Sequence, residues 1–531
     1  MQALIAGWIE QFARSSRKRN RNAVVSWLAL AVACLILLRL FSQWWSPAML
    51  LWIDLHVPYA VNFWSEPPLF VQIHRIATGR PAYLAPYSAD SWTYGPLYIY
   101  LLAAIDRLFE AKPSIVTLRL ISVTIGYVTV LPLLAALVGI RLRHASGRSW
   151  SGTLVACALT LSLFGILDMR ALSFTALHPD GLVYVCVAGA IAAVVWYPLA
   201  RNKAAVLAIL VAFCFLASLT KLNLAPLIGF LVAALAIERF IRWRLAIALC
   251  VGMVLAIAAV YAGASDALRA WTIVIPGHHW YETPRLLVYL VWRNWVGAET
   301  YQAYLVLAAI GTVGFVAWIG RKREALAWTV ILGGVFGAAY MGLAKQGGGP
   351  FDLWFFYVAC LIPTGAAVDA LFRVSGGRFK MVVVSRLVAL AYLGVITMTV
   401  PSGPHQHALL PPEGRRALQR ADLRLARLCR PGHTVIVTWF VDPFLDCQNA
   451  QFSTWDAIGE ILTARSHGYG SRIFLDDPIG AATLIEYGAY PLQVRFSEPH
   501  VETTIEIWDG YSFGYSPKKL YVWTPRGVRP P

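Results

Sequence analysis

Residues 51–98, LWIDLHVPYAVNFWSEPPLFVQIHRIATGRPAYLAPYSADSWTYGPLY, form the longest polar break in the apolar first half of the chain. They directly follow the first apolar run that is long enough to cross a membrane. Their ionisable side chains include Asp54, His56, Glu66, His74, Arg75, Arg80 and Asp90. Ionisable groups beside a membrane-embedded body are costly and usually have a function there. The stretch therefore predicts a functional loop at the membrane surface rather than a plain connection.

The composition is that of a polytopic membrane protein. Of the 531 residues, 58% are hydrophobic and only 14% are charged, and the mean hydropathy is +0.60, which excludes an ordinary soluble protein. The formal net charge of +17 would suggest a nucleic-acid partner in a soluble protein. Here Lys and Arg fall in short clusters between apolar runs, which is how membrane topology is encoded. We therefore expect no nucleic-acid partner.

Apolar runs of the right length predict about 11 membrane-spanning helices. The runs are 24–41, 115–140, 152–167, 181–198, 204–220, 223–237, 245–262, 302–320, 325–344, 354–372 and 381–400. The segment 94–109, YGPLYIYLLAAIDRLF, is apolar on one side but too short to cross comfortably. We expect it to be a helix lying in the membrane interface.

Basic clusters set the predicted orientation. If the segment 94–109 does not cross, they all share one side of the membrane: Arg141, Arg143 and Arg148; Arg201 and Lys203; Arg239, Arg242 and Arg244; Arg321, Lys322 and Arg323; Arg373, Arg378 and Lys380. Positive loops stay in the cytoplasm. The amphipathic basic segment 1–22 is then cytoplasmic and not a cleaved signal peptide. The first outer loop, 42–114, and the chain's C-terminal part face the periplasm of a bacterial inner membrane.

From about residue 401 the composition becomes that of a soluble domain. GRRALQRADLRLARLC has helical periodicity, TVIVTWF reads as a strand, and TTIEIWDGYSFGYSPKKLYVWTP reads as two strands around a turn. These patterns predict a small α/β domain over 401–531, after a membrane domain over 23–400. Cys429 and Cys447 are the two cysteines in polar sequence. They either form a disulfide, if the domain lies outside the cytoplasm, or are unrelated thiols.

Several motifs, in order, resemble a known family. The first loop reads N-F-W-S-E66-P-P-L-F, G79-R-P-A-Y83 and T93-Y-G-P-L-Y98, followed by L177-H-P-D180-G-L, S218-L-T-K221 and K345-Q-G-G-G-P-F-D-L-W. Over roughly residues 20–375 this order resembles the GT-C class of integral-membrane glycosyltransferases. It is most similar to bacterial members related to the protein O-mannosyltransferase and aminoarabinose-transferase families. The first loop of this chain has no adjacent Asp-Glu or Asp-x-Asp pair, whereas the commonest pattern in that class has one. Which carboxylate is catalytic, and whether a metal is required, therefore stays open.

The resemblance implies an inverting glycosyltransferase that takes a monosaccharide from a polyprenyl-phosphate donor to a glycan, lipid or protein acceptor of the cell envelope. Such a transfer needs a carboxylate base for the acceptor hydroxyl and cations for the departing phosphate. Glu66 is the first candidate for the base, and Asp54 is the second. Glu66 could instead cap the turn at PPLF. Asp90 lies in a turn-like YSADSW and is a candidate for a local cap.

Further candidates lie at the predicted outer ends of the spans. Asp180 could orient a sugar hydroxyl or bind a divalent cation such as Mg or Mn with Asp54 or Glu66, or it could simply favour the start of its helix. His178 fits a hydrogen-bonding neighbour better than a metal ligand. Lys221, between two apolar runs, must reach outward or meet an anion. It is a candidate for donor-phosphate binding, and the other two are Lys345 and Arg75.

Sugar contacts are expected from Tyr83 and Tyr94 of the first loop, and from His278, His279 and Arg285 of the loop 263–301, which could also be an ordered lid. Two other functions are compatible with the sequence. A transporter or flippase of a lipid-linked sugar would require charges near the middle of the spans, whereas most charges here lie in loops and at span ends. A non-catalytic scaffold would leave the loop carboxylates without a role.

Overall fold

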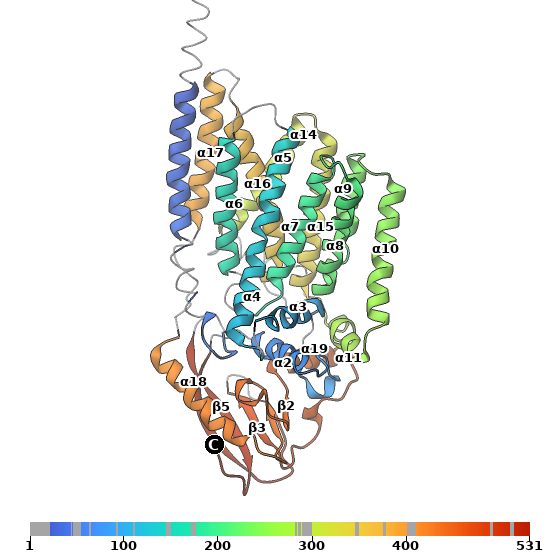
Figure 1. Cartoon of the computed structure of the whole chain (residues 1–531), viewed down its shortest axis with the longest axis vertical. Helices are drawn as coiled ribbons and strands as arrows, with labels where there is room; N and C mark the ends of the chain where they lie inside the picture. Colours follow the sequence, from blue (N-terminus) through green and yellow to red (C-terminus); the bar gives the residue numbers. More distant parts are fainter. Residues whose placement is uncertain are drawn as a thin grey trace, which may run out of the picture.

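The computed structural model describes residues 22–43, 45, 52, 55–62, 65–91, 94–109, 112–144, 150–170, 177–281, 284, 288, 292, 300–345, 350–374, 379–400, 410–488, 492–509 and 515–531. Long helices form a bundle, and a region of strands and shorter helices packs against one end of it (Figure 1). We call the latter the C-terminal region (residues 410–531). The predicted first-loop carboxylate Asp54 and the lid residue Arg285 lie outside the described residues.

Every apolar run predicted to span the membrane is a helix. Those long and apolar enough to cross are Asn22–Gln43, the continuous pair α4 (Ile115–Val128) and α5 (Val130–His144), α8 (Lys203–Thr220), α10 (Trp243–Ala262), α14 (Thr300–Trp318), α15 (Lys322–Ala344), α16 (Trp354–Arg373) and α17 (Phe379–Thr399). The other predicted spans are α6 (Ser151–Arg170), α7 (Asp180–Trp196) and α9 (Leu227–Ile237), the last preceded by η3 (Leu222–Leu224). The chain is thus a multi-pass membrane protein.

Two of these helices form the centre of the bundle. Almost all the side chains of α7 and α16 are buried among other helices. Their burial against other helices, and not against lipid alone, places them inside the bundle. By contrast α10 exposes most of its apolar side chains, as a helix facing lipid does.

Short helices lie between the bundle and the C-terminal region. They are α2 (Glu66–Ala77), η1 (Pro86–Ser88), α3 (Leu97–Asp106), α11 (Asp266–Arg269), the π-helical turn Ala270–Val274 and α12 (Ile275–Gly277). α2 and α3 cross the end of the bundle instead of extending it (Figure 1). α3 has 10 residues, about half the length that a span requires. The predicted interfacial helix is therefore confirmed as a short helix that does not continue a span.

The C-terminal region is built on a five-stranded sheet with the order β2-β1-β3-β5-β4. Its strands are β1 (Val435–Val437), β2 (Ala450–Phe452), β3 (Thr483–Tyr487), β4 (His500–Asp509) and β5 (Ser516–Pro525), and its helices are α18 (Pro412–Leu425), η6 (Ala426–Leu428), η7 (Asp442–Phe444), α19 (Trp455–Ser466) and η8 (Phe474–Asp476). β1 pairs in parallel with β2 and β3, and β5 pairs antiparallel with β3 and β4.

The sheet confirms the expected α/β class of the C-terminal region, and two more particular predictions can be checked against it. β1 and β3 are fully buried, as strands covered on both faces should be. The predicted pair of strands around a turn is the β4–β5 hairpin, which runs from His500 opposite Pro525 to Asp509 opposite Ser516. Cys429 and Cys447 form a disulfide across 18 residues, with their Cα atoms 5.6 Å apart. This disulfide links the end of η6 to the loop before β2.

Candidate functional site

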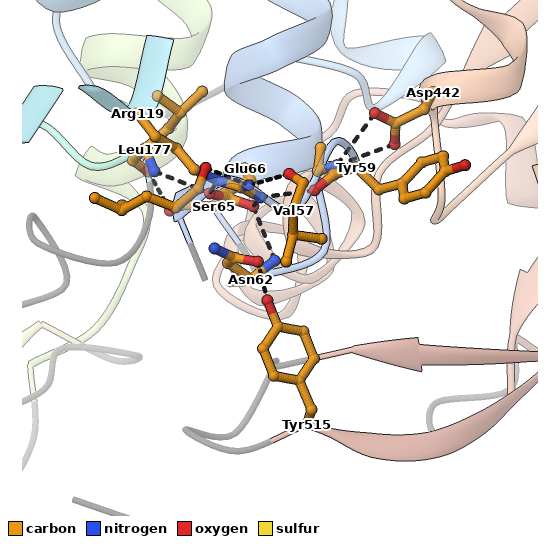
Figure 2. Close-up of polar contacts among 11 residues, drawn as sticks. Val57, Tyr59, Asn62, Ser65, Glu66, Arg119, Leu177, Asp442 and Tyr515 are labelled. Carbon is orange, nitrogen blue, oxygen red and sulfur yellow. Dashed lines mark hydrogen bonds and ion pairs between the residues drawn. The ribbon is translucent and has the colours of Figure 1, made fainter. Parts of the chain in front are cut away.

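Glu66 forms a buried, two-pronged ion pair with Arg119 (Figure 2). Nε and Nη2 of Arg119 each donate to one carboxylate oxygen at 2.6 Å, and both side chains are 0% exposed. The backbone N–H groups of Asn62 and Leu177 also donate to Glu66, at 2.9 and 3.2 Å. A carboxylate has about four lone-pair positions. Glu66 therefore has few acceptor positions left for a substrate proton.

Local sequence explains why Glu66 lies there. It is the first residue of α2 and is followed by Pro67 and Pro68. Proline suits the first turn of a helix, and a carboxylate there favourably meets the positive end of the helix dipole. Arg119 comes from α4, one turn inside the predicted span. An arginine buried at that depth requires a partner, and Glu66 supplies it.

Arg119 also fixes the shape of the loop before α2. Its guanidinium donates to the carbonyl oxygens of Val57 at 2.5 Å and Tyr59 at 2.6 Å. The planar arginine fork can satisfy a carboxylate and several carbonyls together, which a lysine cannot. One side chain thus holds both the start of α2 and the backbone of 57–59 in a single arrangement.

The C-terminal region holds the same loop from the other side (Figure 2). Both carboxylate oxygens of Asp442, in η7, accept from the Ala60 N–H at 3.1 Å. The Tyr515 hydroxyl, just before β5, donates to Oδ1 of Asn62. Burial raises the pKa of Asp442 to about 7, although the hydrogen bonds from Ala60 have the opposite effect and lower it. The loop 57–62 is consequently held by hydrogen bonds to Arg119 on one side and to the C-terminal region on the other.

A second group of charges lies around Lys221. Its Nζ is 2.7 Å from Oδ1 of Asp180 and 3.3 Å from Oδ1 of Asp352, and the Lys221 side chain is only 3% exposed. Nδ1 of His178 lies 3.1 Å from Oδ2 of Asp180. Burial opposes the charge on Lys221, but the carboxylates, Asp180 first, outweigh it and raise the pKa of Lys221 well above its ordinary value. We call Tyr94, His178, Asp180, Lys221 and Asp352 the Lys221 cluster.

Tyr94 covers this cluster. The Lys221 ammonium lies 4.8 Å from the centre of the Tyr94 ring, close enough for a cation–π contact, and His178 meets the ring edge-on at 5.8 Å. The Tyr83 hydroxyl donates to the Tyr94 carbonyl at 2.9 Å. The structure therefore brings together the predicted residues Tyr83, Tyr94, His178, Asp180 and Lys221.

A glycine permits the close approach on which the cluster depends. The N–H of Gly95 donates to the carbonyl of Thr220 at 3.1 Å. A Cβ at Gly95 would come within 2.0 Å of the Leu219 carbonyl oxygen, so no other residue fits without displacing the backbone. The contact joins the residue after Tyr94 to the residue before Lys221.

The two groups of charges are connected through the residues before α7. Leu177 donates its N–H to Glu66, and its carbonyl accepts from the Ser65 hydroxyl at 2.6 Å. Three residues later, Asp180 begins α7 beside Lys221. The first loop, α4 and α7 therefore meet at one place, at the end of the bundle that faces the C-terminal region.

The remaining predicted residues are paired elsewhere. Arg75 Nη2 donates to Asp90 Oδ2 at 2.5 Å, so Asp90 binds a side chain 15 residues away in addition to its local contact with Ser91. Lys345 Nζ lies 3.2 Å from Oε2 of Glu460 in α19.

The two lid histidines also contact neighbouring elements. His279 lies 3.2 Å from the same Glu460 carboxylate oxygen that meets Lys345. His278 bonds to the Val274 carbonyl at 2.8 Å and packs against the Tyr469 ring. Lys345 and His279 thus meet at Glu460 of the C-terminal region, and the charge of this carboxylate also acts on Tyr94 of the Lys221 cluster.

Sequence reasoning missed four charged residues of these arrangements. Arg119 carried a signal, because it is a charge inside a predicted span. Asp352 lies in the motif K345-Q-G-G-G-P-F-D, and its position there could have marked it as a partner for a cation. Glu460 and Asp442 come from the C-terminal region, and nothing in the sequence indicates which outer loop they contact.

The described residues contain no group of three or more His, Cys, Asp or Glu side chains that could hold a metal ion. Asp180 is the described member of the predicted metal pair, and its two oxygens face Lys221 and His178. A neighbouring ammonium opposes a cation at the same carboxylate. The described part of the cluster therefore does not fit a metal, and we derive no chemical step through one.

No protein-family model matches the chain, and no curated protein matches it in sequence. Its fold does resemble solved structures. ArnT from Cupriavidus metallidurans bound to undecaprenyl phosphate aligns with a TM-score of 0.51 at 12% identity, over 92% of this chain and 98% of that one. The Archaeoglobus fulgidus oligosaccharyltransferase in its apo form aligns with a TM-score of 0.46 at 12% identity, over 86% of this chain and 69% of that one.

A structure of the same oligosaccharyltransferase in complex with zinc and sulfate aligns with a TM-score of 0.44 at 14% identity, over 80% of this chain and 62% of that one. The likeness to ArnT extends over nearly the whole of both chains, so it includes the C-terminal region. The GT-C-type fold that the motifs predicted is confirmed by this likeness.

Proposed function

We propose that this protein is an inverting glycosyltransferase that moves a monosaccharide from a polyprenyl-phosphate donor to a hydroxyl acceptor of the cell envelope. The observation that carries the proposal is the Lys221 cluster, a buried ammonium held between two carboxylates. The fold it shares with ArnT, a protein whose structure contains undecaprenyl phosphate, supports the same donor chemistry.

Lys221 is the proposed ligand of the donor phosphate. An ammonium in a buried site binds a phosphate strongly because little water competes for it. When the donor enters, its phosphate would take the place of Asp352, the more distant carboxylate at 3.3 Å. Lys345 and Arg75 are secondary candidates, since each already pairs with a carboxylate, Glu460 and Asp90.

Asp180 is the proposed base. In the transfer the acceptor oxygen attacks C1 of the sugar, the C1–O bond to phosphate breaks, and the phosphate leaves with the bonding electrons as polyprenyl phosphate. The acceptor attacks the face of C1 opposite the phosphate, and its proton passes to Oδ2 of Asp180, the carboxylate oxygen that faces His178 and not Lys221. His178, beside that carboxylate, would orient it. Tyr94 and Tyr83 would shape the sugar site, with His278 and His279 at its margin. Arg285 stays a predicted sugar contact.

Glu66 is better placed as a positioning residue than as the base. Its oxygens accept from Arg119, Asn62 and Leu177, and withdrawing it would leave Arg119 buried without its partner. Breaking a buried pair costs about 3–5 kcal/mol. Asp54 stays the other proposed base. The divalent cation (Mg or Mn) that the sequence predicted between Asp54 and Asp180 is not part of this proposal, because Lys221 and His178 already face the two oxygens of Asp180.

The proposed setting is the inner membrane of a bacterium. The segment 1–22 and the basic loops would lie in the cytoplasm, the membrane part 23–400 would form the catalytic domain, and the C-terminal domain 401–531 would lie in the periplasm. In that compartment the sugar donor must be lipid-linked.

The experiment measures donor turnover by the purified full-length protein. Undecaprenyl-phosphate-linked hexoses and pentoses are supplied one at a time with a cell-envelope extract, and release of undecaprenyl phosphate and labelling of the extract are followed. We expect one donor to react. Lys221→Met leaves Asp180 and Asp352 without their cation, so it should lower stability, and the protein that stays folded should have a KM raised about tenfold, as loss of a charged hydrogen bond does. Lys112→Met removes an exposed lysine that pairs with Asp446 and should have no effect.

Two results would contradict the proposal. One is that no lipid-linked donor is consumed by wild-type protein that binds undecaprenyl phosphate. The other is that the labelled lipid crosses the membrane of a proteoliposome without losing its sugar, which would identify a transporter.

A further inference from the structure

A deep apolar groove lies at the end of the bundle opposite the Lys221 cluster. Its volume is about 490 Å³, and it lies between α5, α14, α15, α16 and α17. The ends of α5 and α14 that border it are the ends farthest from the C-terminal region (Figure 1). The volume is within the range of small-molecule and lipid sites.

The sequence explains why the helices leave a groove there. The facing sides of α14 and α16 carry small residues, among them Gly311, Ala366 and Ala367. A Cβ at Gly311 would meet nothing within 4 Å. Pro363 lies inside α16 and lines the groove, and a proline inside a helix removes a backbone hydrogen bond and bends the helix.

The groove has a charged end. Arg321, Glu324, His144 and Arg373 line it. Arg321 bonds to Nδ1 of His144 at 2.6 Å and lies 3.6 Å from Oε2 of Glu324, yet its side chain is still 47% exposed. Among the lining side chains, two are arginines, Arg321 and Arg373, and one is a carboxylate, Glu324. The groove is thus apolar along its length and cationic at its mouth.

We propose that the groove binds one phospholipid with an anionic headgroup. An acyl chain would fill the space between Gly311 and Pro363, and the phosphate would meet Arg321. Basic pockets between transmembrane helices recognise anionic headgroups in this way, and apolar walls alone would accept any acyl chain. The basic N-terminal stretch, with Arg14, Arg17 and Lys18, is a poorer occupant because its charge repels that of the mouth.

The experiment is native mass spectrometry of the full-length protein from nanodiscs of phosphatidylglycerol and phosphatidylethanolamine. The wild type should retain one phosphatidylglycerol after mild delipidation. Gly311→Leu, which fills the groove, should lose it. Arg321→Gln should lower the preference for phosphatidylglycerol over phosphatidylethanolamine by about tenfold, the usual effect of a charged hydrogen bond.

Matched controls lie on the lipid-facing helix α10. Gly252 also has nothing within 4 Å of an added Cβ, and Arg244 is an exposed arginine near the start of that helix. Gly252→Leu and Arg244→Gln should leave lipid retention unchanged. Equal retention by wild type and Gly311→Leu, or equal losses in the controls, would overturn the proposal. So would a lipid that appears only after residues 1–21 are removed, because that stretch would then be the occupant.

Discussion

Glu66 and Asp180 begin as the same kind of residue. Each is the first residue of a helix, each lies beside proline, and each is a buried carboxylate paired with a cation at the same end of the bundle. Their partners differ. Arg119 holds Glu66 with two parallel bonds and also binds the carbonyls of Val57 and Tyr59.

Lys221, by contrast, divides one ammonium between Asp180 and Asp352. A bidentate arginine in a fixed network stabilises one geometry, whereas a lysine between two carboxylates can exchange one of them for another anion. We infer from this comparison that the Glu66–Arg119 pair holds the structure around the site, whereas the Asp180–Lys221 pair can take part in the proposed transfer.

The largest effect is expected from breaking the first pair. Arg119→Met removes the partner of a carboxylate that is 0% exposed, which should lower the free energy of unfolding by about 3–5 kcal/mol. Little folded protein should then be recovered by size-exclusion chromatography in detergent. Arg107→Met removes an exposed arginine at the end of α3 and serves as the control. Wild-type thermal stability of Arg119→Met would remove the distinction between the two pairs.

Asp180→Asn tests the second pair. Lys221 keeps Asp352 at 3.3 Å in this variant, so we expect a stability loss of only about 1–3 kcal/mol and well-folded protein. Transfer should fall about 10²–10⁴-fold, since a positioned proton acceptor contributes that much. Asp266→Asn, at an exposed carboxylate of α11, should behave as wild type. Near-normal turnover by Asp180→Asn would leave Asp54 as the proposed base.

Tyr515→Phe tests whether the C-terminal region supports only the Glu66–Arg119 pair and not the Lys221 cluster. It removes the hydroxyl that donates to Asn62 and should cost about 1 kcal/mol. The melting temperature should fall by a few degrees, while the affinity for undecaprenyl phosphate stays unchanged because Lys221 is not involved. A loss of lipid affinity without a loss of stability would show that the two pairs act as one unit.

A further prediction concerns the pH dependence of stability. Burial raises the pKa of Asp442 to about 7, from an ordinary value of 3.8. Between these values the unfolded chain loses a proton that the folded chain keeps, so this residue's contribution to stability falls as the pH rises from about 4 to 7 and is constant above. In the variant Asp442→Asn, the asparagine side chain stays neutral at every pH, and its carbonyl oxygen can still accept from Ala60.

We therefore expect the melting temperature of Asp442→Asn to fall less than that of the wild type between pH 5 and pH 8. The difference in free energy of unfolding at pH 8 should be about 1–3 kcal/mol in favour of the variant. Asp446→Asn, at an exposed carboxylate, is the control. Parallel melting curves for wild type and Asp442→Asn over this range would contradict the assigned burial effect.

Local sequence was sufficient to predict the helices of the bundle and part of the C-terminal region. Length and apolarity identified the helices of the bundle, because the bilayer requires long apolar runs whatever their neighbours are. Strand periodicity indicated the β4–β5 hairpin. Polar surroundings distinguished Cys429 and Cys447 from the other cysteines, and the structure shows that they form a disulfide. The motifs contained Glu66, Asp180 and Lys221 because ionisable residues are rare and conspicuous in such a chain.

The partners of the charged residues, by contrast, became known from the three-dimensional arrangement. Arg119 lies 53 residues from Glu66, Asp352 lies 131 residues from Lys221, and Asp442 lies 382 residues from Ala60. No local pattern fixes such pairings, because they depend on how the helices pack and on where the C-terminal region lies. Since the partner decides whether a buried carboxylate is held or can react, the roles of Glu66 and Asp180 separate only in three dimensions.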